Sequence, residues 1–167
     1  MSSGHSSCQA IRVVSTDEAA SALRDLLHAY VATWYDSDSE WPDEDRELVS
    51  QAPLGFRPPD GQAWLAYVGA EPVGCVLLRG VDSAQAEILK LFVLEEFRNR
   101  GLARQLMTTA LGHASQNGYC VAILSVASDR VPALSLYYQL GFTASVAPSP
   151  PGMISLRYPL QAAPAAD

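Results

Sequence analysis

Apolar residues recur at two different spacings along the chain, and this change of spacing predicts both helices and strands. Between residues 19 and 31 the spacing is helical, which predicts one apolar helix face. The residues on that face are Ala19, Ala20, Leu23, Leu26, Leu27, Tyr30 and Val31. Just before them, Ser15 stands three residues ahead of Glu18, the pattern of a capping box that opens a helix. A short strand is expected at residues 11–14, and Pro42 is expected to start a second, shorter helix.

Short apolar runs between turn residues predict a series of strands. Residues 63–68 and 73–78 are two such runs, and the intervening Gly69-Ala70-Glu71-Pro72 is typical of a hairpin turn. Further strands are expected at residues 86–94, 119–126, 142–146 and 154–158, and further helices at residues 101–117 and 132–140. Asn117-Gly118 and Gly141 are expected to end these two helices. The predicted order, β-α-α-β-β-β-α-β-α-β-β, combines a hairpin with a strand–helix–strand unit and therefore implies a mixed sheet.

The length and composition fit one globular domain. The chain has 167 residues, of which 49% are hydrophobic and 17% charged, so it can bury a core without disulfide bonds. We expect a single domain at residues 10–160. The polar residues 1–9 and the Ala- and Pro-rich residues 161–167 are expected to be mobile tails.

The charge and the cysteines exclude several classes of function. The chain has 11 Lys and Arg against 18 Asp and Glu, a net charge of −7, which argues against nucleic-acid binding and against an anionic membrane surface. No apolar run reaches the roughly 20 residues that span a bilayer, and the first residues lack an apolar signal core. Cys8, Cys75 and Cys120 form no Cys-x-x-Cys pair, which argues against zinc and predicts a reduced, cytoplasmic setting. Cys75 and Cys120 fall in apolar strands and are expected to be buried, inert thiols.

Basic residues gather in one short segment of this acidic chain. Lys90, Arg98, Arg100 and Arg104 are four of its 11 basic residues. The last three lie in a loop between an expected strand and an expected helix, where free backbone N–H groups and the helix dipole favour a phosphate. Gly101 would let the phosphate approach the backbone closely. The loop has neither the Gly-x-Gly-x-x-Gly pattern of dinucleotide-binding folds nor a Walker A sequence.

This loop resembles the signature of a known family. Arg98-x-x-Gly101-x-Ala103 is similar to the Arg/Gln-x-x-Gly-x-Gly/Ala motif of the GNAT family of N-acetyltransferases. The preceding strand is similar to that family's fourth strand, and Ala133-x-x-Leu136-Tyr137-x-x-x-Gly141-Phe142 resembles its late-helix motif. The resemblance covers residues 64–142 and implies an α/β fold, a GNAT-type mixed central sheet of about six or seven strands flanked by about four helices. The asparagine that usually begins the late motif is replaced by Arg130, to which we assign no contact.

The resemblance implies a site for acetyl-CoA as co-substrate. In the family acetyl-CoA lies in a cleft where the fourth and fifth strands separate, and its pantetheine arm pairs with the fourth strand like an added β-strand. Here the paired residues correspond to Phe92, Val93 and Leu94. The pyrophosphate would rest on the loop residues Arg98, Asn99, Arg100, Gly101, Leu102, Ala103 and Arg104. The acetyl group would pass directly to an amine, with no metal. The amide N–H of Val93 would stabilise the negative charge that develops on the thioester oxygen.

The resemblance also suggests the catalytic groups. Tyr137 matches the family's tyrosine acid, which reprotonates the leaving thiolate; the alternatives are a core tyrosine, or a role for Tyr138, about 100° further around the helix. Glu87 is the candidate base, and the alternatives are a solvated or salt-bridged glutamate with a chain of waters as base. Lys90 is expected on the opposite face of the strand from Glu87, as a surface or phosphate-side charge.

The acceptor is the least determined part of the reaction. In the family the first two helices border the acceptor site, and here Trp34, Tyr35, Asp36 and Trp41 combine aromatic rings with carboxylates, which suits a cationic amine. The expected acceptor is therefore a small polar amine: an amino acid, a polyamine or an amino-sugar compound. A solvated acidic face is the simpler alternative. A calcium loop is disfavoured because its essential sixth-position glycine would be Trp41. A protein lysine or N-terminal amine, or a non-catalytic acyl-CoA sensing domain, remain alternatives. By family analogy the chain could form a homodimer.

Overall fold

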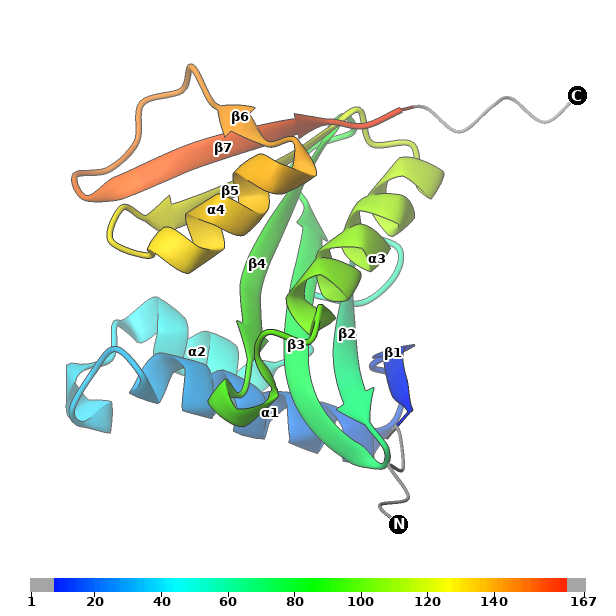
Figure 1. Cartoon of the computed structure of the whole chain (residues 1–167), viewed down its shortest axis with the longest axis vertical. Helices are drawn as coiled ribbons and strands as arrows, with labels where there is room; N and C mark the ends of the chain where they lie inside the picture. Colours follow the sequence, from blue (N-terminus) through cyan, green and yellow to red (C-terminus); the bar gives the residue numbers. More distant parts are fainter. Residues whose placement is uncertain (1–7, 162–167) are drawn as a thin grey trace, which may run out of the picture.

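The computed structural model describes residues 8–161, over which seven strands form one sheet with four α-helices packed around it (Figure 1). The strands are β1 Gln9–Val13, β2 Gly61–Val68, β3 Glu71–Gly80, β4 Gln85–Val93, β5 Val121–Ala127, β6 Thr143–Ala144 and β7 Met153–Pro159. The helices are α1 Asp17–Ala32, α2 Asp43–Gln51, α3 Leu102–Gln116 and α4 Val131–Leu140, with short 3-10 turns at Asp38–Glu40 and Glu95–Phe97. The predicted order of helices and strands is confirmed.

The sheet is mixed, as the sequence predicts. Its strands lie in the order β1-β2-β3-β4-β5-β7-β6, and β4 and β5 form the one parallel pair in the described part of the chain. Each face of the sheet carries its own apolar core. Helices α3 and α4 pack on one face around Trp64, Leu106 and Phe142, whereas α1 and α2 cover the other around Leu23 and Leu77. Burial of these two faces holds the helices against the sheet.

Helix α1 begins one residue later than the capping-box pattern predicts. Thr16 has an extended backbone, and its side-chain oxygen accepts a hydrogen bond from the N–H of Ala19 at 3.1 Å. The prediction of Ser15 as the cap is therefore wrong, because the first helical residue is Asp17 and the cap must directly precede it. Pro42, which was expected to start the second helix, is instead the residue just before α2, whose first helical residue is Asp43.

The N-terminal boundary of the domain and one of the cysteines also differ from expectation. Gln9 belongs to β1, where it pairs with Val68, so the first domain strand starts within the predicted tail; residues 1–7 and 162–167 lie outside the described part. Cys120 is exposed, and the prediction that it is buried is wrong because β5 begins after it. Cys75 is fully buried, and burial raises the pKa of its thiol to about 12.

Strand β6 is shorter than the run at residues 142–146 predicts. The strand comprises Thr143 and Ala144, which pair with β7, and the N–H of Ser145 still donates to the carbonyl of Ser155 at 2.8 Å. Beyond it, Val146 is fully in solvent. Strand β4 is irregular in another way. Its register against β3 shifts between Cys75 and Leu77, and Lys90 there has a positive φ of 53°. This bulge changes which side chains of β4 face each side of the sheet.

None of the helices in residues 8–161 is long and apolar enough to cross a bilayer.

Candidate active site

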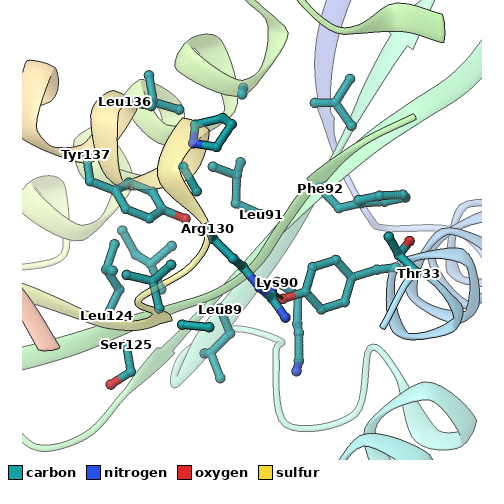
Figure 2. A pocket seen from close by; sticks show the side chains of 18 of the residues that line it. Thr33, Leu89, Lys90, Leu91, Phe92, Leu124, Ser125, Arg130, Leu136 and Tyr137 are labelled. Carbon is teal, nitrogen blue, oxygen red and sulfur yellow. Dashed lines mark hydrogen bonds between the residues drawn. The ribbon is translucent and has the colours of Figure 1, made fainter. Parts of the chain in front are cut away.

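A cavity of about 1100 Å³ opens where β4 and β5 separate. The two strands pair only from Gln85 to Glu87, and the rest of β5 pairs with β7 instead. Figure 2 shows the walls of this cavity, with Phe92 on β4, Leu124 on β5, Leu136 on α4 and Thr33 at the end of α1. The cavity is therefore a direct product of the sheet topology, as in other open sheets where a ligand site forms between diverging strands.

The backbone of β4 offers a free donor to this cavity. The N–H of Leu94 donates to the carbonyl of Val73 on β3 at 2.8 Å. Because successive N–H groups alternate along a strand, the N–H of Val93 points away from β3, toward the gap beside β5. Phe92 and Val93 line the cavity, whereas Leu94 does not. Of the three residues expected to pair with the pantetheine arm, Val93 is thus the best placed, and the N–H of Leu94 is already used.

The loop that precedes α3 is built to receive an anion. Gly101 caps α3 with φ 81°, a backbone that favours glycine, and a Cβ there would meet only the end of the Gln105 side chain, at 4.0 Å. The first turn of α3 has no acidic residue, and no side chain caps its N–H groups. The cavity is lined here by the loop residues Arg98, Asn99 and Gly101 and by Leu102, Ala103 and Arg104 of the first turn of α3, whereas Arg100 lies outside it.

Arg98 in this loop and Arg104 in the first turn of α3 have no carboxylate partner within residues 8–161. Across residues 8–161 the ion pairs are His28–Asp38, Arg46–Asp43, Arg79–Glu87 and Lys90–Asp45. Arg98 is held instead by the carbonyl of Val93 at 2.9 Å, and Arg104 by the side-chain oxygen of Gln139 at 2.9 Å. These neutral acceptors fix the two guanidinium groups but leave their charge available to an anion.

Tyr137 places a protonated hydroxyl in the cavity. The residue is 8% exposed on α4, and its hydroxyl points toward the Arg130 side chain (Figure 2). Burial raises the pKa of this hydroxyl above its usual value; nearby Tyr30 raises it further, and Arg130 opposes the shift. The neighbouring Tyr138 is 51% exposed and does not line the cavity, which disfavours it as the alternative.

Glu87 and Lys90 both line the cavity, and both are ion-paired. Arg79 binds one carboxylate oxygen of Glu87 through two nitrogens, at 2.8 and 2.9 Å, so the salt-bridged alternative for Glu87 is present and its role as a base stays a prediction. Lys90 lies at the bulge of β4, and its ammonium is 2.6 Å from the carboxylate of Asp45 on α2. The prediction that Lys90 is a surface or phosphate-side charge is therefore wrong, because the bulge turns it toward α2.

The residues predicted for the acceptor divide into two groups. Trp34 and Tyr35 line the cavity, whereas Asp36 and Trp41 do not. Trp41 is buried, with its ring 4.9 Å from that of His28, and Asp36 is exposed. The structure thus brings half of the predicted set to the cavity wall.

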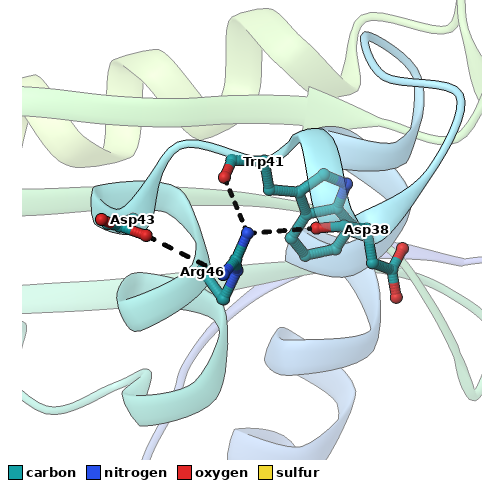
Figure 3. Close-up of polar contacts among 4 residues, drawn as sticks. All are labelled: Asp38, Trp41, Asp43 and Arg46. Carbon is teal, nitrogen blue, oxygen red and sulfur yellow. Dashed lines mark hydrogen bonds and ion pairs between the residues drawn. The ribbon is translucent and has the colours of Figure 1, made fainter.

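The acidic segment is held together by one arginine. Arg46 of α2 donates to the carbonyls of Asp38 and Trp41, at 3.4 and 3.0 Å, and lies 3.8 Å from the carboxylate of Asp43 (Figure 3). These contacts therefore shape the connection between α1 and α2. Within residues 8–161 no group of three or more His, Cys, Asp or Glu is arranged to hold a metal ion.

Arg130 lines the cavity, although the sequence reasoning assigned it no contact. Its guanidinium lies 3.5 Å from the centre of the Trp34 ring and donates a hydrogen bond to the hydroxyl of Tyr30. It therefore occupies the aromatic face that we expected to bind the acceptor amine. The replacement of the family's asparagine by an arginine is the one signal in the sequence that marks this position, and it does not show that the side chain reaches α1.

Comparisons with known proteins agree with this geometry. A family model described as "Acetyltransferase (GNAT) family" matches residues 23–142. N-acetyltransferase 8 of Mus musculus is 32% identical over 84 residues, which are 47% of this chain and 37% of that protein. N-acetylaspartate synthetase of Rattus norvegicus is 31% identical over 88 residues, which are 52% of this chain and 29% of that protein. The matched part is thus about a third of the length of these curated relatives.

Solved structures show the same fold at low sequence identity. An acetyltransferase of the GNAT family from Staphylococcus aureus superposes with a TM-score of 0.78 at 16% identity, covering 92% of this chain and 100% of that one. The PaiA N-acetyltransferase from Thermoplasma acidophilum, in complex with coenzyme A, gives a TM-score of 0.73 at 18% identity, covering 91% of this chain and 99% of that one. The family model spans most of the chain and the fold agrees with it, so the chain belongs to the acetyltransferase (GNAT) family.

Proposed function

We propose that this protein is an acetyl-CoA-dependent N-acetyltransferase that moves an acetyl group directly to the primary amine of a small polar molecule. The observation that carries this proposal is one continuous cavity. It joins the open first turn of α3, the free N–H of Val93 and the buried hydroxyl of Tyr137. An anion site, a donor for a developing negative charge and an acid thus line one space.

The residues of the loop before α3 fit the phosphates of acetyl-CoA. The space in front of Gly101 and the free amides of the first turn form a cradle that a Cβ would narrow. Arg98 and Arg104 would hold the pyrophosphate with their uncompensated charge. When bound, acetyl-CoA supplies an acetyl thioester, whose carbonyl is open to attack by an amine.

The protein groups then have three separate tasks. The Val93 N–H donates to the oxygen that gains negative charge. Tyr137 donates its proton to the departing sulfur, and burial suits it to this task because the hydroxyl stays protonated. Glu87 accepts the proton that the acceptor ammonium must lose, directly or through water, with Arg79 fixing the position of its carboxylate.

Two observations favour a small acceptor. Helices α1 and α2 bring Tyr30, Trp34 and Asp45 to the cavity wall, so the acceptor end is bordered by side chains rather than by a long open groove. Moreover, one matched relative is named N-acetylaspartate synthetase, a name that contains an acetylated amino acid. A free amino compound is therefore the acceptor class that we put forward.

Calorimetric titration of acetyl-CoA into the protein tests this function first. We expect a dissociation constant in the micromolar range and its loss in Gly101→Glu, because the added carboxylate enters the anion cradle. Gly118→Glu is the matched control, since Gly118 has a similar positive φ of 85° at the far end of α3 and open space around it. A panel of amines with detection of released thiol then follows. No binding to the wild-type protein, or equal loss in both variants, would contradict the donor site.

A further inference from the structure

The acceptor half of the cavity contains a cation that has no carboxylate partner within residues 8–161. Arg130 belongs to none of the four ion pairs in this part of the chain. One nitrogen of its guanidinium donates to the hydroxyl of Tyr30, and its Nε is buried without any hydrogen-bond partner. A guanidinium has five N–H donors, so most of its capacity is unused. A partly buried charge with unused donors is costly unless an anion meets it.

The other basic residues that line the cavity are not unpaired cations in its acceptor half. The ammonium of Lys90 is neutralised by Asp45 at 2.6 Å. Arg98 lies in the loop before α3 and Arg104 in the first turn of α3, where the donor phosphates are expected. Arg130, in contrast, is directed to α1, against Trp34 and Tyr30. Among the described residues it is therefore the free positive charge on the side that α1 and α2 border.

Contacts with two aromatic rings also hold the Arg130 side chain in place before any ligand binds. Its guanidinium stacks on the Trp34 ring at 3.5 Å and lies over the Tyr30 ring at 5.5 Å, which limits its rotation. A planar, held guanidinium matches a carboxylate because it can offer two parallel N–H groups. Figure 2 shows the Tyr137 hydroxyl directed toward the same side chain. A small molecule whose carboxylate is bound by Arg130 can thus keep its amine beside the Tyr137 hydroxyl, which takes part in the proposed reaction.

We propose that the acceptor carries a carboxylate near its primary amine, as an amino acid does, and that Arg130 binds this carboxylate. This inference rests on the proposed function and specifies its substrate class. It also changes the role expected for Trp34, because the ring face that would attract an ammonium is covered by a guanidinium. A peptide-chain amine lacks the adjacent carboxylate and would leave Arg130 unpaired.

The experiment compares pairs of acceptors in the wild-type protein and in Arg130→Gln. Each standard L-amino acid is assayed beside its carboxamide, which keeps the amine but has no negative charge, and kcat/KM is measured by thiol release. For the best pair, we expect the ratio of carboxylate to carboxamide to fall about tenfold or more in Arg130→Gln, as for a lost hydrogen bond to a charged group. Comparing ratios removes the intrinsic difference in reactivity between the two amines.

Two further variants and one binding measurement complete the design. Arg12→Gln is the matched control, because Arg12 also lies over an aromatic ring, Tyr67 at 5.0 Å, but outside the cavity; its ratio should be unchanged. Arg130→Lys keeps the charge without the planar fork and should retain part of the preference. Titration with acetyl-CoA should give the same affinity for Arg130→Gln as for the wild type, which also shows that the variant is folded.

The outcomes separate this inference from the proposed function. An unchanged ratio in Arg130→Gln overturns the inference, and so does a weaker affinity for acetyl-CoA with an unchanged ratio, which would assign Arg130 to the donor. A wild-type protein that binds acetyl-CoA but acetylates no member of the panel, or uses only amines without a carboxylate, also overturns it. Failure of the wild type to bind acetyl-CoA overturns the proposed function itself.

Discussion

Tyr137 is the residue whose chemistry depends most on where the fold places it. As the acid of the proposed reaction it should contribute about a hundredfold or more to turnover. We therefore expect Tyr137→Phe to lower kcat by about this factor while the affinity for acetyl-CoA is unchanged. Tyr138→Phe is the matched control, because it removes the same hydroxyl from the adjacent, exposed residue. Equal rates in wild type and Tyr137→Phe would remove Tyr137 from the mechanism.

The pH profile checks the same assignment. Burial raises the pKa of Tyr137 above that of a free tyrosine, so the proton needed by the leaving group is present at every pH below about 10. The acceptor amine, in contrast, loses its proton as the pH rises. The wild-type kcat/KM should therefore rise or stay level from about pH 8 to about pH 10, without a falling limb. A falling limb within this range that disappears in Tyr137→Phe would contradict the raised pKa.

Single residues were predictable where a local motif defined them. Gly101 and Tyr137 were identified from short motifs, and both line the cavity. Arg130 and Asp45 were not, because their contacts, to Trp34 and to Lys90, join parts of the chain that are far apart in sequence. A spacing rule describes one element at a time, so it contains no information about which side chain of another element lies opposite.

Among the helices and strands, α1 allows a test of which residue caps its first turn. Thr16, and not Ser15, accepts the hydrogen bond from the first turn. Thr16→Ala should therefore lower the free energy of unfolding by about 1 kcal/mol, and the melting temperature by about 2–4 °C. Ser15→Ala should leave both nearly unchanged. Urea unfolding of the two variants measures the difference, and the opposite ranking would restore the capping box that begins at Ser15.

For the helices and strands, apolar periodicity predicts their order but not how the strands pair. The order of helices and strands follows from apolar spacing and turn residues, and every α-helix and strand of the described chain was expected. Apolar spacing gives no sign, however, of the separation of β4 from β5 after Glu87 or of the bulge at Lys90. Both depend on which residues pair between strands that are distant in sequence. The resemblance to the family supplied the separation, whereas the bulge had no signal, and it changed the environment of Lys90.

For the whole molecule, net charge and local charge predict opposite effects of salt on donor binding. The chain carries a net charge of −7, and an anionic ligand is repelled by a field of that sign. Arg98 in the loop before α3 and Arg104 in the first turn of α3 instead have no carboxylate partner in the described chain. Together with the free amides of that turn, they form a local positive site where we propose that the phosphates of acetyl-CoA bind. Because salt screens charges over about 10 Å at 0.1 M, it weakens whichever of the two effects governs affinity.

We expect the local cluster to govern, so the dissociation constant for acetyl-CoA should increase with added salt. Contacts at the loop are closer than the screening length, whereas the acidic groups are spread over the surface of the molecule. Calorimetry at low and high sodium chloride measures the slope, and Arg98→Gln combined with Arg104→Gln should flatten it. Affinity that increases with salt in the wild type would show that net charge dominates. The positive segment of the chain would then be too weak to act as the donor site, and the function built on it would have to be revised.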